Sequence, residues 1–195
     1  MVSSEWDEAT SRRHLWVSDA RMITAQLPRL WNRLWKLHAR VLRRVSHYRW
    51  FGVLGKHVVS PMDRAVIKAS RGRLSMTGPE FTTMLLTTTG RKSGKQRTVP
   101  VYYVPDGKKL VAVCENFGLK TASSWPKNLL ADPRARIEIR GVAADYESRL
   151  ATDQEVARYM PRLTEMWPAM DTYFERTGVR YMFVFELDVE VSTRR

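Results

Sequence analysis

The chain has 195 residues, 44% of them hydrophobic, and a formal net charge of +13 from 33 Lys and Arg against 20 Asp and Glu. This length and apolar content suffice for one domain with a substantial core plus an appendage, and the positive charge favours a polyanionic partner. A single cysteine excludes an internal disulfide. The sequence has no signal-peptide pattern and no apolar run of bilayer length, so we expect a cytoplasmic protein that is soluble or peripheral.

The N-terminal part of the sequence is basic and has a helical pattern. Residues 20–62 contain nine basic residues and no acidic one. Apolar side chains in this segment recur at spacings of three, four and seven, which predicts an amphipathic helix. Pro28 suits its first turn, and Gly52 and Gly55 suit its end. We therefore predict a helical, basic N-terminal extension over residues 1–60.

This helix has two compatible interpretations. Its Trp and Leu face can pack on the body of the protein, or it can lie in the headgroup region of an anionic membrane. The second interpretation predicts peripheral membrane contact through residues 20–60. Nucleic acid is a less favoured partner than a membrane, because the tryptophans lie on the apolar stripe instead of alternating with the basic residues as stacking platforms.

From residue 81 onward the pattern changes to short apolar runs of period two, typical of strands. The predicted strands are Thr82–Thr88, Thr98–Val104, Lys109–Glu115, Arg136–Arg140, Ala143–Leu150 and Tyr181–Asp188. Ser123 or Ser124 can cap a short helix to Leu130, and Asp153 a longer one with Pro168 as a break. Six mostly antiparallel strands with few helices indicate an α+β barrel or sandwich domain over residues 61–195.

Residues 87–100 read TTTGRKSGKQRTVP and place four cations, two glycines and several hydroxyls between two apolar runs. Guanidinium and ammonium groups, hydroxyls and backbone N–H groups all bind phosphate, and the glycines let the main chain approach an anion closely. The segment lacks the spacing of a P-loop or a Rossmann turn. A phosphate-binding turn and a solvated basic hairpin are therefore equally open from these residues alone.

Other catalytic chemistry has little support in the sequence. The four histidines lie in the N-terminal third without a Cys or carboxylate at ligand spacing, so no metal site is predicted. There is no G-x-S-x-G segment and no clear pair of carboxylates for hydrolysis. This composition fits a reaction whose difficult step is carried by a bound cofactor.

Two separated motifs resemble the deazaflavin-dependent nitroreductase family, which has a split β-barrel fold related to FMN-binding oxidoreductases. The first motif runs from Leu85 to Gly94 and continues to Arg97 and Pro100. The second, SWPKNLLADP, covers residues 124–133 and resembles the family's W-x-x-N-L-x-x-x-P element. The resemblance implies coenzyme F420, an 8-hydroxy-5-deazaflavin with a phosphodiester and an oligoglutamate tail. FMN is the alternative cofactor.

The resemblance also implies which residues bind this cofactor. Those matching the phosphate positions are Arg91, Lys92, Ser93 and Arg97. Val99 and Pro100 match the strand that lies along the deazaflavin ring, and Asn116 lies in the turn after the third strand. The second motif contributes Trp125, Asn128 and Leu129.

The region of the expected substrate pocket departs from the family. Relatives that reduce nitro compounds show a Y-P-x-Y-x-x-Y pattern, where this chain has WPAMDTY at residues 167–173. The residues expected to bind the acceptor are Tyr102, Trp167, Met170 and Tyr173, and Tyr173 is also the expected catalytic residue because its hydroxyl can stabilise charge on a reduced oxygen. The expected reaction is hydride transfer to a hydrophobic acceptor such as a quinone or a nitroaromatic. A non-catalytic, membrane-associated basic protein is the alternative from another class.

Overall fold

In the part of the chain that the structure describes, four helical segments precede the strands. The computed structural model describes residues 29–70, 72, 74–78, 81–119, 123–177 and 181–187. The helical segments are α3 (Arg29–Val45), α4 (Arg49–Leu54), the π-helical turn η2 (Gly55–Val59) and α5 (Ser60–Ala69). The last three follow one another without a break and form one continuous helix, so the boundary predicted at residue 60 falls inside it. Residues 20–28 of the predicted membrane segment lie outside the described residues.

The prediction that Gly52 and Gly55 end the first helix is wrong. Both glycines are buried inside the continuous helix, where it packs against the turn that follows the third strand. A Cβ atom on Gly52 would lie 2.4 Å from the carbonyl oxygen of Phe117, and one on Gly55 would lie 2.8 Å from the Phe117 ring. These positions therefore need glycine because helix and turn approach so closely.

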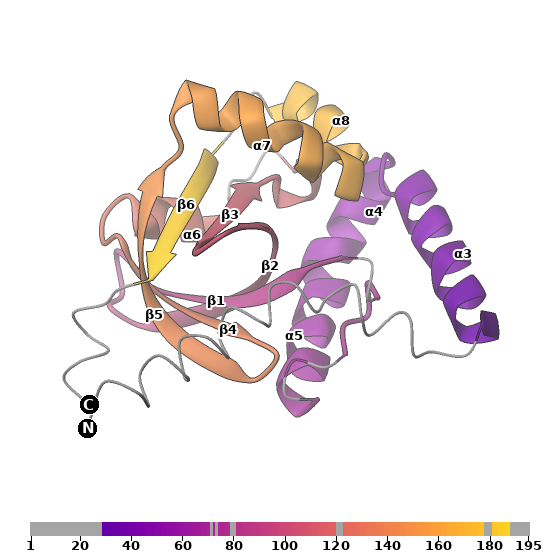
Figure 1. The fold of residues 1–195 in the computed structure, drawn as a ribbon, viewed down its shortest axis with the longest axis horizontal. Helices are drawn as coiled ribbons and strands as arrows, with labels where there is room; N and C mark the ends of the chain where they lie inside the picture. The colour runs from indigo at the N-terminus through magenta and orange to yellow at the C-terminus, as the bar shows by residue number, and fades with distance from the viewer. Residues whose placement is uncertain are drawn as a thin grey trace.

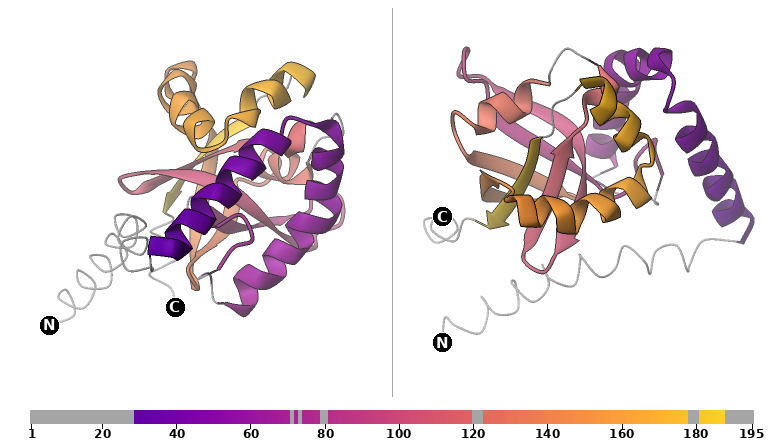
Figure 2. Two further views of the ribbon diagram at one scale, coloured as in Figure 1. Left: turned by 90° about the vertical axis from the view of Figure 1, so that its right-hand side faces the viewer. Right: turned by 90° about the horizontal axis from the view of Figure 1, so that it is seen from above.

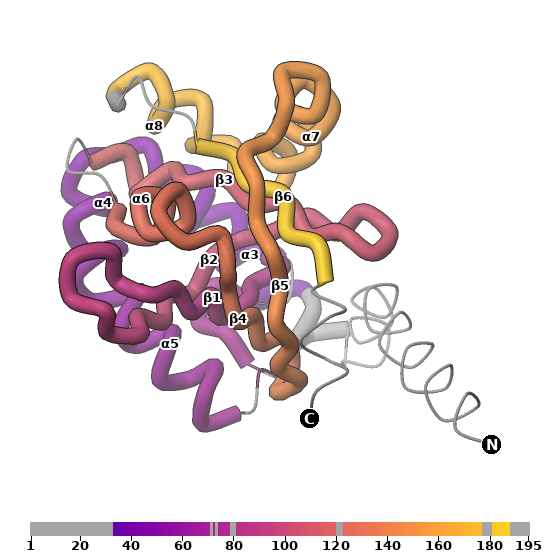
Figure 3. Tube along the Cα trace, turned by 90° about the vertical axis from the view of Figure 1, so that its left-hand side faces the viewer, coloured from indigo at the N-terminus to yellow at the C-terminus, as the bar shows by residue number. Residues whose placement is uncertain are grey.

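Six antiparallel strands form a closed barrel in the order β1-β2-β3-β6-β5-β4 (Figure 1; Figure 3 views it from the opposite side to the N-terminal helices). The strands are β1 (Thr83–Thr89), β2 (Gln96–Asp106), β3 (Lys109–Cys114), β4 (Arg134–Ile139), β5 (Val142–Leu150) and β6 (Tyr181–Leu187). In β1, Leu86 lies opposite Val99 of β2 on one side and Ile137 of β4 on the other, which closes the ring of strands. This confirms the predicted α+β fold and the presence of all six strands. Their ends differ by a few residues: Thr82, Glu115 and Arg140 were predicted in strands but lie just outside them, and Asp188 lies outside the described residues.

Alternating side chains of the strands belong to two hydrophobic cores. In β3, Leu110 and Ala112 lie in the barrel core, which also contains Trp125 of α6 (Ser124–Leu129). Val111 and Val113 point to the other face, where a second core forms with the helices around the barrel. This is the period of two that marked the strands in the sequence.

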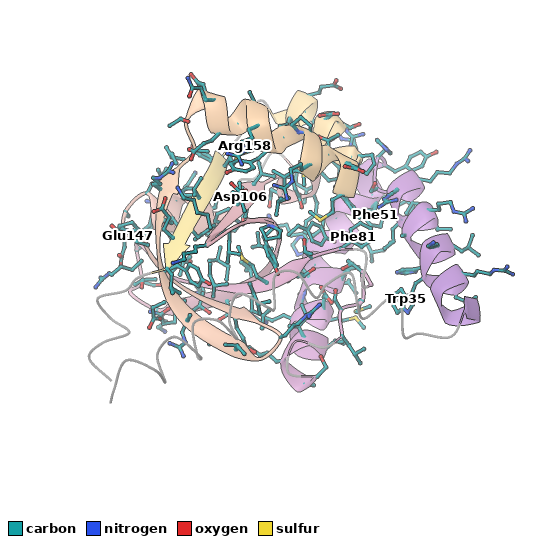
Figure 4. The ribbon with its side chains drawn as sticks, viewed as in Figure 1. Trp35, Phe51, Phe81, Asp106, Glu147 and Arg158 are labelled. Carbon is teal, nitrogen blue, oxygen red and sulfur yellow. The ribbon has the colours of Figure 1, made fainter. Side chains whose placement is uncertain are left out.

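Helices α7 (Asp153–Met166) and α8 (Ala169–Thr177) lie across one end of the molecule and are separated at Pro168, as predicted. The predicted cap of α7, Asp153, is wrong by one residue. The Thr152 hydroxyl accepts the N–H of Glu155, and the Glu155 carboxylate accepts the N–H of Thr152, which makes Thr152 the first residue of a capping box. Asp106 of β2 anchors α7, since it accepts hydrogen bonds from Arg158 and the Tyr159 hydroxyl (Figure 4).

The N-terminal helices cover one side of the barrel (Figure 2, left). The inner face of α3 is buried: Ala39 is 1% exposed, and His38 Nε2 lies 3.0 Å from the carbonyl oxygen of Met76. Leu34 and Val41, on the outer face of α3, are about half exposed. The interpretation of α3 as a helix packed on the protein is therefore confirmed for one face only. No helix among the described residues is long and apolar enough to cross a membrane.

Candidate functional site

Two adjoining cavities lie between the continuous helix α4–η2–α5, strand β2 and helix α6. The first, called the β2 cavity below, has a volume of about 300 Å³, and the second, called the cationic cavity, a volume of about 570 Å³. Lys56, Val99, Ser123 and Trp125 line both cavities. A single ligand can therefore extend from one cavity into the other.

The cationic cavity has a lining suited to an anion. Its lining contains five cationic side chains and no carboxylate, and the cations are Lys56, Arg91, Lys92, Arg97 and Lys127. Ser93, Ser123 and Ser124 add hydroxyl groups to the same lining. Guanidinium, ammonium and hydroxyl groups together make charge-assisted hydrogen bonds to phosphate or carboxylate oxygens.

The turn between β1 and β2 presents these groups because its backbone folds back on itself. The Gly90 carbonyl oxygen accepts the N–H groups of Ser93 and Gly94 at 3.0 and 2.7 Å, and the Gly90 N–H donates to Lys95 at 2.9 Å. Gly94 has a φ of 66°, which glycine adopts without strain. A Cβ atom on Gly90 would lie 2.7 Å from the Ser93 hydroxyl oxygen. The glycines of the tract therefore shape the turn.

Asn128 of α6 joins the two sequence motifs. Its side-chain Nδ2 donates to the Thr88 hydroxyl at 3.0 Å, and its Oδ1 accepts the backbone N–H of Arg91 at 3.2 Å. Asn128 is 4% exposed and Thr88 is 1% exposed, so these bonds are sheltered from water. The second motif thus fixes the position of the first.

The β2 cavity has a less polar wall. Strand β2 contributes Val99, Pro100, Val101 and Tyr102, and the helix opposite contributes Val59 and Pro61 among others. Arg64 of α5 holds the helix against the strand, since its Nη1 donates to the carbonyl oxygen of Thr98 at 3.1 Å. The apolar wall of β2 faces a helical wall of mixed polarity, and the space between them is a slot suited to a flat ring.

Two carboxyl groups, Asp63 and Glu115, also line the β2 cavity. Desolvation raises the pKa of both groups, and that of Glu115 reaches about 7. Asp63 accepts the Met76 N–H at 2.7 Å and the Ser75 hydroxyl at 3.2 Å. Glu115 accepts the N–H of Phe117 through its Oε2.

Tyr102 presents its side chain to the same cavity. Desolvation, followed by the nearby Glu115 carboxylate, raises the pKa of Tyr102 far above neutrality, so its hydroxyl keeps its proton. The Tyr102 ring lies 5.5 Å from the ring of Trp167 and 5.8 Å from that of Phe81. Trp167 is therefore a support behind the cavity wall.

The structure brings most of the predicted site residues together. Arg91, Lys92, Ser93, Arg97 and Asn128 line the cationic cavity, Pro100, Tyr102 and Asn116 line the β2 cavity, and Val99 and Trp125 line both.

Four predicted site residues, Leu129, Trp167, Met170 and Tyr173, line neither cavity. Each is at most 3% exposed and belongs to a hydrophobic core. The hydroxyl of Tyr173 donates to the carbonyl oxygen of Ser46 at 2.7 Å. Their predicted contact with cofactor or acceptor, and the catalytic role of Tyr173, gain no support from these positions.

Sequence reasoning missed the contributions of Lys56, Asp63 and Ser123 to the site. Lys56 and Asp63 come from the continuous helix, which pairs with β2 only in the folded chain. Their local sequence carries no signal of this. Glu115 was missed as well, since its position in the sequence marked it only as the last residue of a predicted strand.

Comparison with known proteins shows the family of this chain. The sequence model of the family F420H(2)-dependent quinone reductase matches residues 62–187. The Mycobacterium tuberculosis protein "Putative F420H(2)-dependent quinone reductase Rv3178" is 29% identical over 90 residues, which are 46% of this chain and 76% of that protein.

Two solved structures are also similar. The F420-H2 Dependent Reductase FDR-A is 28% identical with a TM-score of 0.49, covering 54% of this chain and 94% of that one. A structure described as a domain-swapped dimer is 24% identical with a TM-score of 0.51, covering 65% of this chain and 96% of that one, and shows the same fold. Since the family match spans well over half of the sequence, the chain belongs to the F420H2-dependent quinone reductases, oxidoreductases whose cofactor is coenzyme F420.

Proposed function

We propose that this chain transfers a hydride from reduced coenzyme F420 to a flat, hydrophobic acceptor, with a quinone as the first candidate and a nitroaromatic as the second. The observation that carries this proposal is the junction of the cationic cavity with the β2 cavity. A cofactor with a phosphodiester at one end and a flat ring at the other matches that pair of cavities.

The residues present fit such a cofactor. Arg91, Lys92, Ser93 and Arg97 would hold the phosphodiester, and Lys127 would pair with carboxylates of the tail. Val99 and Trp125 line the junction, where the ring would begin. When bound, the cofactor supplies the hydride. The chain binds it, orients its ring and keeps water from the slot.

The acceptor would share the β2 cavity with the ring. Tyr102 is the aromatic side chain of β2 in this lining, and an acceptor ring can pack on it. Trp167 packs against Tyr102 from behind, and Tyr173 joins α8 to the turn that follows α3 through its bond to Ser46. We therefore assign the direct acceptor contact to Tyr102.

Titration with the deazaflavin tests the cofactor assignment. Because Trp125 lines both cavities, binding should quench part of the tryptophan fluorescence at micromolar ligand, and Trp125→Phe should lose that part. FMN in the same assay is the competitor, and it should bind more weakly because it lacks the oligoglutamate tail. No binding at low ionic strength, or tighter binding of FMN, would contradict the assignment.

The acceptor is tested by following oxidation of the reduced deazaflavin. We expect menaquinone to accelerate the oxidation more than a nitroaromatic compound does. Equal rates with and without either acceptor would contradict a reductase function for this site.

We further propose that the enzyme works at the inner face of an anionic membrane. Trp50, Val53, Leu54, Val58 and Met62 recur at helical spacing along the continuous helix and are all at least 41% exposed. Residues 29–70 contain one carboxylate, Asp63, which is buried. An exposed apolar stripe among basic residues is suited to an anionic bilayer. The same helix lines the β2 cavity, so this contact would bring lipid-soluble quinones to its wall.

Liposome flotation tests the membrane contact. The protein should float with vesicles containing phosphatidylglycerol and much less with neutral vesicles. Trp50→Ser with Leu54→Ser should abolish flotation, whereas Leu150→Ser, which removes an exposed leucine from β5, should leave it unchanged. Flotation that is insensitive to the double substitution would exclude this surface.

A further inference from the structure

The two carboxyl groups of the β2 cavity differ in how their oxygens are used. Asp63 has both oxygens engaged by Met76 and Ser75, so it fixes the chain that follows α5. Glu115 accepts the Phe117 N–H through Oε2, and its Oε1 has no hydrogen-bond partner among the described residues. Glu115 therefore has an oxygen left for a ligand in the cavity that it lines.

The backbone around Glu115 is held in place from two sides. Asn116 and Phe117 adopt left-handed φ values of 44° and 53°, which are unfavourable for residues with side chains. The continuous helix touches this turn at Gly52 and Gly55, as described above. On the other side, a Cβ atom on Gly118 would lie 2.6 Å from the ring of Tyr173. A strained turn held this closely fixes the position of the carboxyl group.

Ionisable groups from five elements face the carboxyl or share its cavity. They are Lys56 of η2, Asp63 and Arg64 of α5, Tyr102 of β2, Cys114 of β3 and Tyr173 of α8. Desolvation raises the pKa of Cys114 to about 12 and those of the two tyrosines well above neutrality, so all three keep their protons. The pKa of Glu115, about 7, lets its carboxyl be protonated or charged under neutral conditions.

Reduction of a quinone needs a proton as well as a hydride. We infer that Glu115 is the proton donor of the reaction, delivering its carboxyl proton to the oxygen of an acceptor held in the β2 cavity. This inference rests on the proposed function. The hydride brings two electrons and one proton from the reduced deazaflavin, the Glu115 O–H bond breaks, and a new O–H bond forms on the acceptor. The quinone becomes a hydroquinone, and the Glu115 carboxylate regains a proton from water.

Substitution Glu115→Gln tests this role. Its amide oxygen can still accept the Phe117 N–H, but the side chain can no longer supply a carboxyl proton. With menadione as acceptor we expect kcat to fall by about 100-fold, the lower end of the range for general acid catalysis. The wild-type rate should decline above pH 7 as Glu115 ionises, and this decline should be absent from the variant.

A second acceptor, whose reduction needs no proton, separates loss of proton donation in Glu115→Gln from other effects of the substitution on the enzyme. A phenazinium cation becomes neutral on accepting a hydride and needs no proton from the protein, so its reduction should be nearly unaffected by Glu115→Gln. Glu147→Gln, on β5 at the far side of the barrel (Figure 4), is the matched control and should behave as wild type with both acceptors.

Two measurements without turnover complete the test. NMR of protein labelled with ¹³C at the glutamate carboxyl groups should show one resonance titrating near pH 7 that Glu115→Gln removes. Deazaflavin affinity, from tryptophan fluorescence, should be unchanged in the variant. A variant that reduces menadione as fast as wild type overturns the role of Glu115 alone. A wild-type protein that neither binds nor oxidises the deazaflavin overturns the proposed function and this inference with it.

Discussion

The cationic cavity and the β2 cavity share four lining residues, yet they are assembled differently. Most of the cationic cavity comes from two short segments, the β1–β2 turn and the start of α6, which Asn128 ties together. The β2 cavity takes its walls from the continuous helix, three strands and the turn after β3. The first is therefore a local structure that carries charge, and the second depends on how distant elements pack.

The largest effect that this difference predicts is on cofactor affinity. Arg91→Ala with Lys92→Ala should weaken deazaflavin binding by about 100-fold or more, since each charge-assisted hydrogen bond contributes about 1.5–3 kcal/mol. Binding should also become less sensitive to salt. Fluorescence titration at two ionic strengths measures both effects. Lys108→Ala, which removes an exposed lysine at the β2–β3 turn, is the control and should bind normally.

Gly52→Ala perturbs the β2 cavity, because Gly52 packs against the Phe117 turn that lines it. Alanine normally favours a helix interior over glycine by about 1 kcal/mol, but here its methyl group would meet the Phe117 carbonyl at 2.4 Å. We expect a loss of about 2–3 kcal/mol in unfolding free energy, as for an overpacked core. Urea denaturation measures this loss, and Val53→Ala on the same helix should show little of it. A stabilised Gly52→Ala protein would show that helix and turn are not in close contact.

Asn128→Ala tests the link between the two motifs. It removes the donor to Thr88 and the acceptor for the Arg91 N–H, and we expect about 1–2 kcal/mol of destabilisation from the lost hydrogen bonds. Deazaflavin affinity should fall together with stability because the turn loses its support. Thermal unfolding and the same titration measure the two effects. If affinity fell without any loss of stability, Asn128 would instead contact the cofactor directly.

The smallest effect is a pH dependence of stability at Glu115. Its pKa in the folded protein is about 7, above the ordinary value of 4.5, so folding disfavours the charged form. The contribution of Glu115 to the unfolding free energy is therefore fully present below pH 4.5 and is lost as the pH rises through 7. Glu115→Gln should raise Tm by a few degrees at pH 8 and hardly at all at pH 5. An equal change at both values would mean that ionisation of Glu115 is not the cause.

The elements that could be predicted from the sequence are those with a local pattern. The strands were predictable because each alternates between two cores, as Leu110 and Val111 do. The gathering of Arg91, Lys92 and Arg97 in one cavity was predictable because these cations are close in sequence. The resemblance of two motifs to a known family supplied the cofactor.

The remaining features depend on contacts that the sequence does not reveal. A glycine within a helical pattern can mark an end or a close approach, and only the position of Phe117 decides between them for Gly52 and Gly55. The hydroxyl of Tyr173 was a candidate for substrate contact, but its partner is the carbonyl of Ser46, 127 residues away. Lys56 was noted only as one basic residue of the N-terminal segment, and the fold places it where the two cavities meet.

The unbroken helix from Arg49 to Ala69 limits how this enzyme can be divided. The family match begins at residue 62, and a fragment designed from that boundary would lack Gly52, Gly55 and Lys56. Such a fragment would keep the whole barrel but lose most of the helical wall opposite β2, and the Phe117 turn would lose its contact with Gly52 and Gly55. We therefore expect the smallest piece that preserves the site to start before Arg49, which would make residues 49–60 of the predicted extension part of the reductase fold.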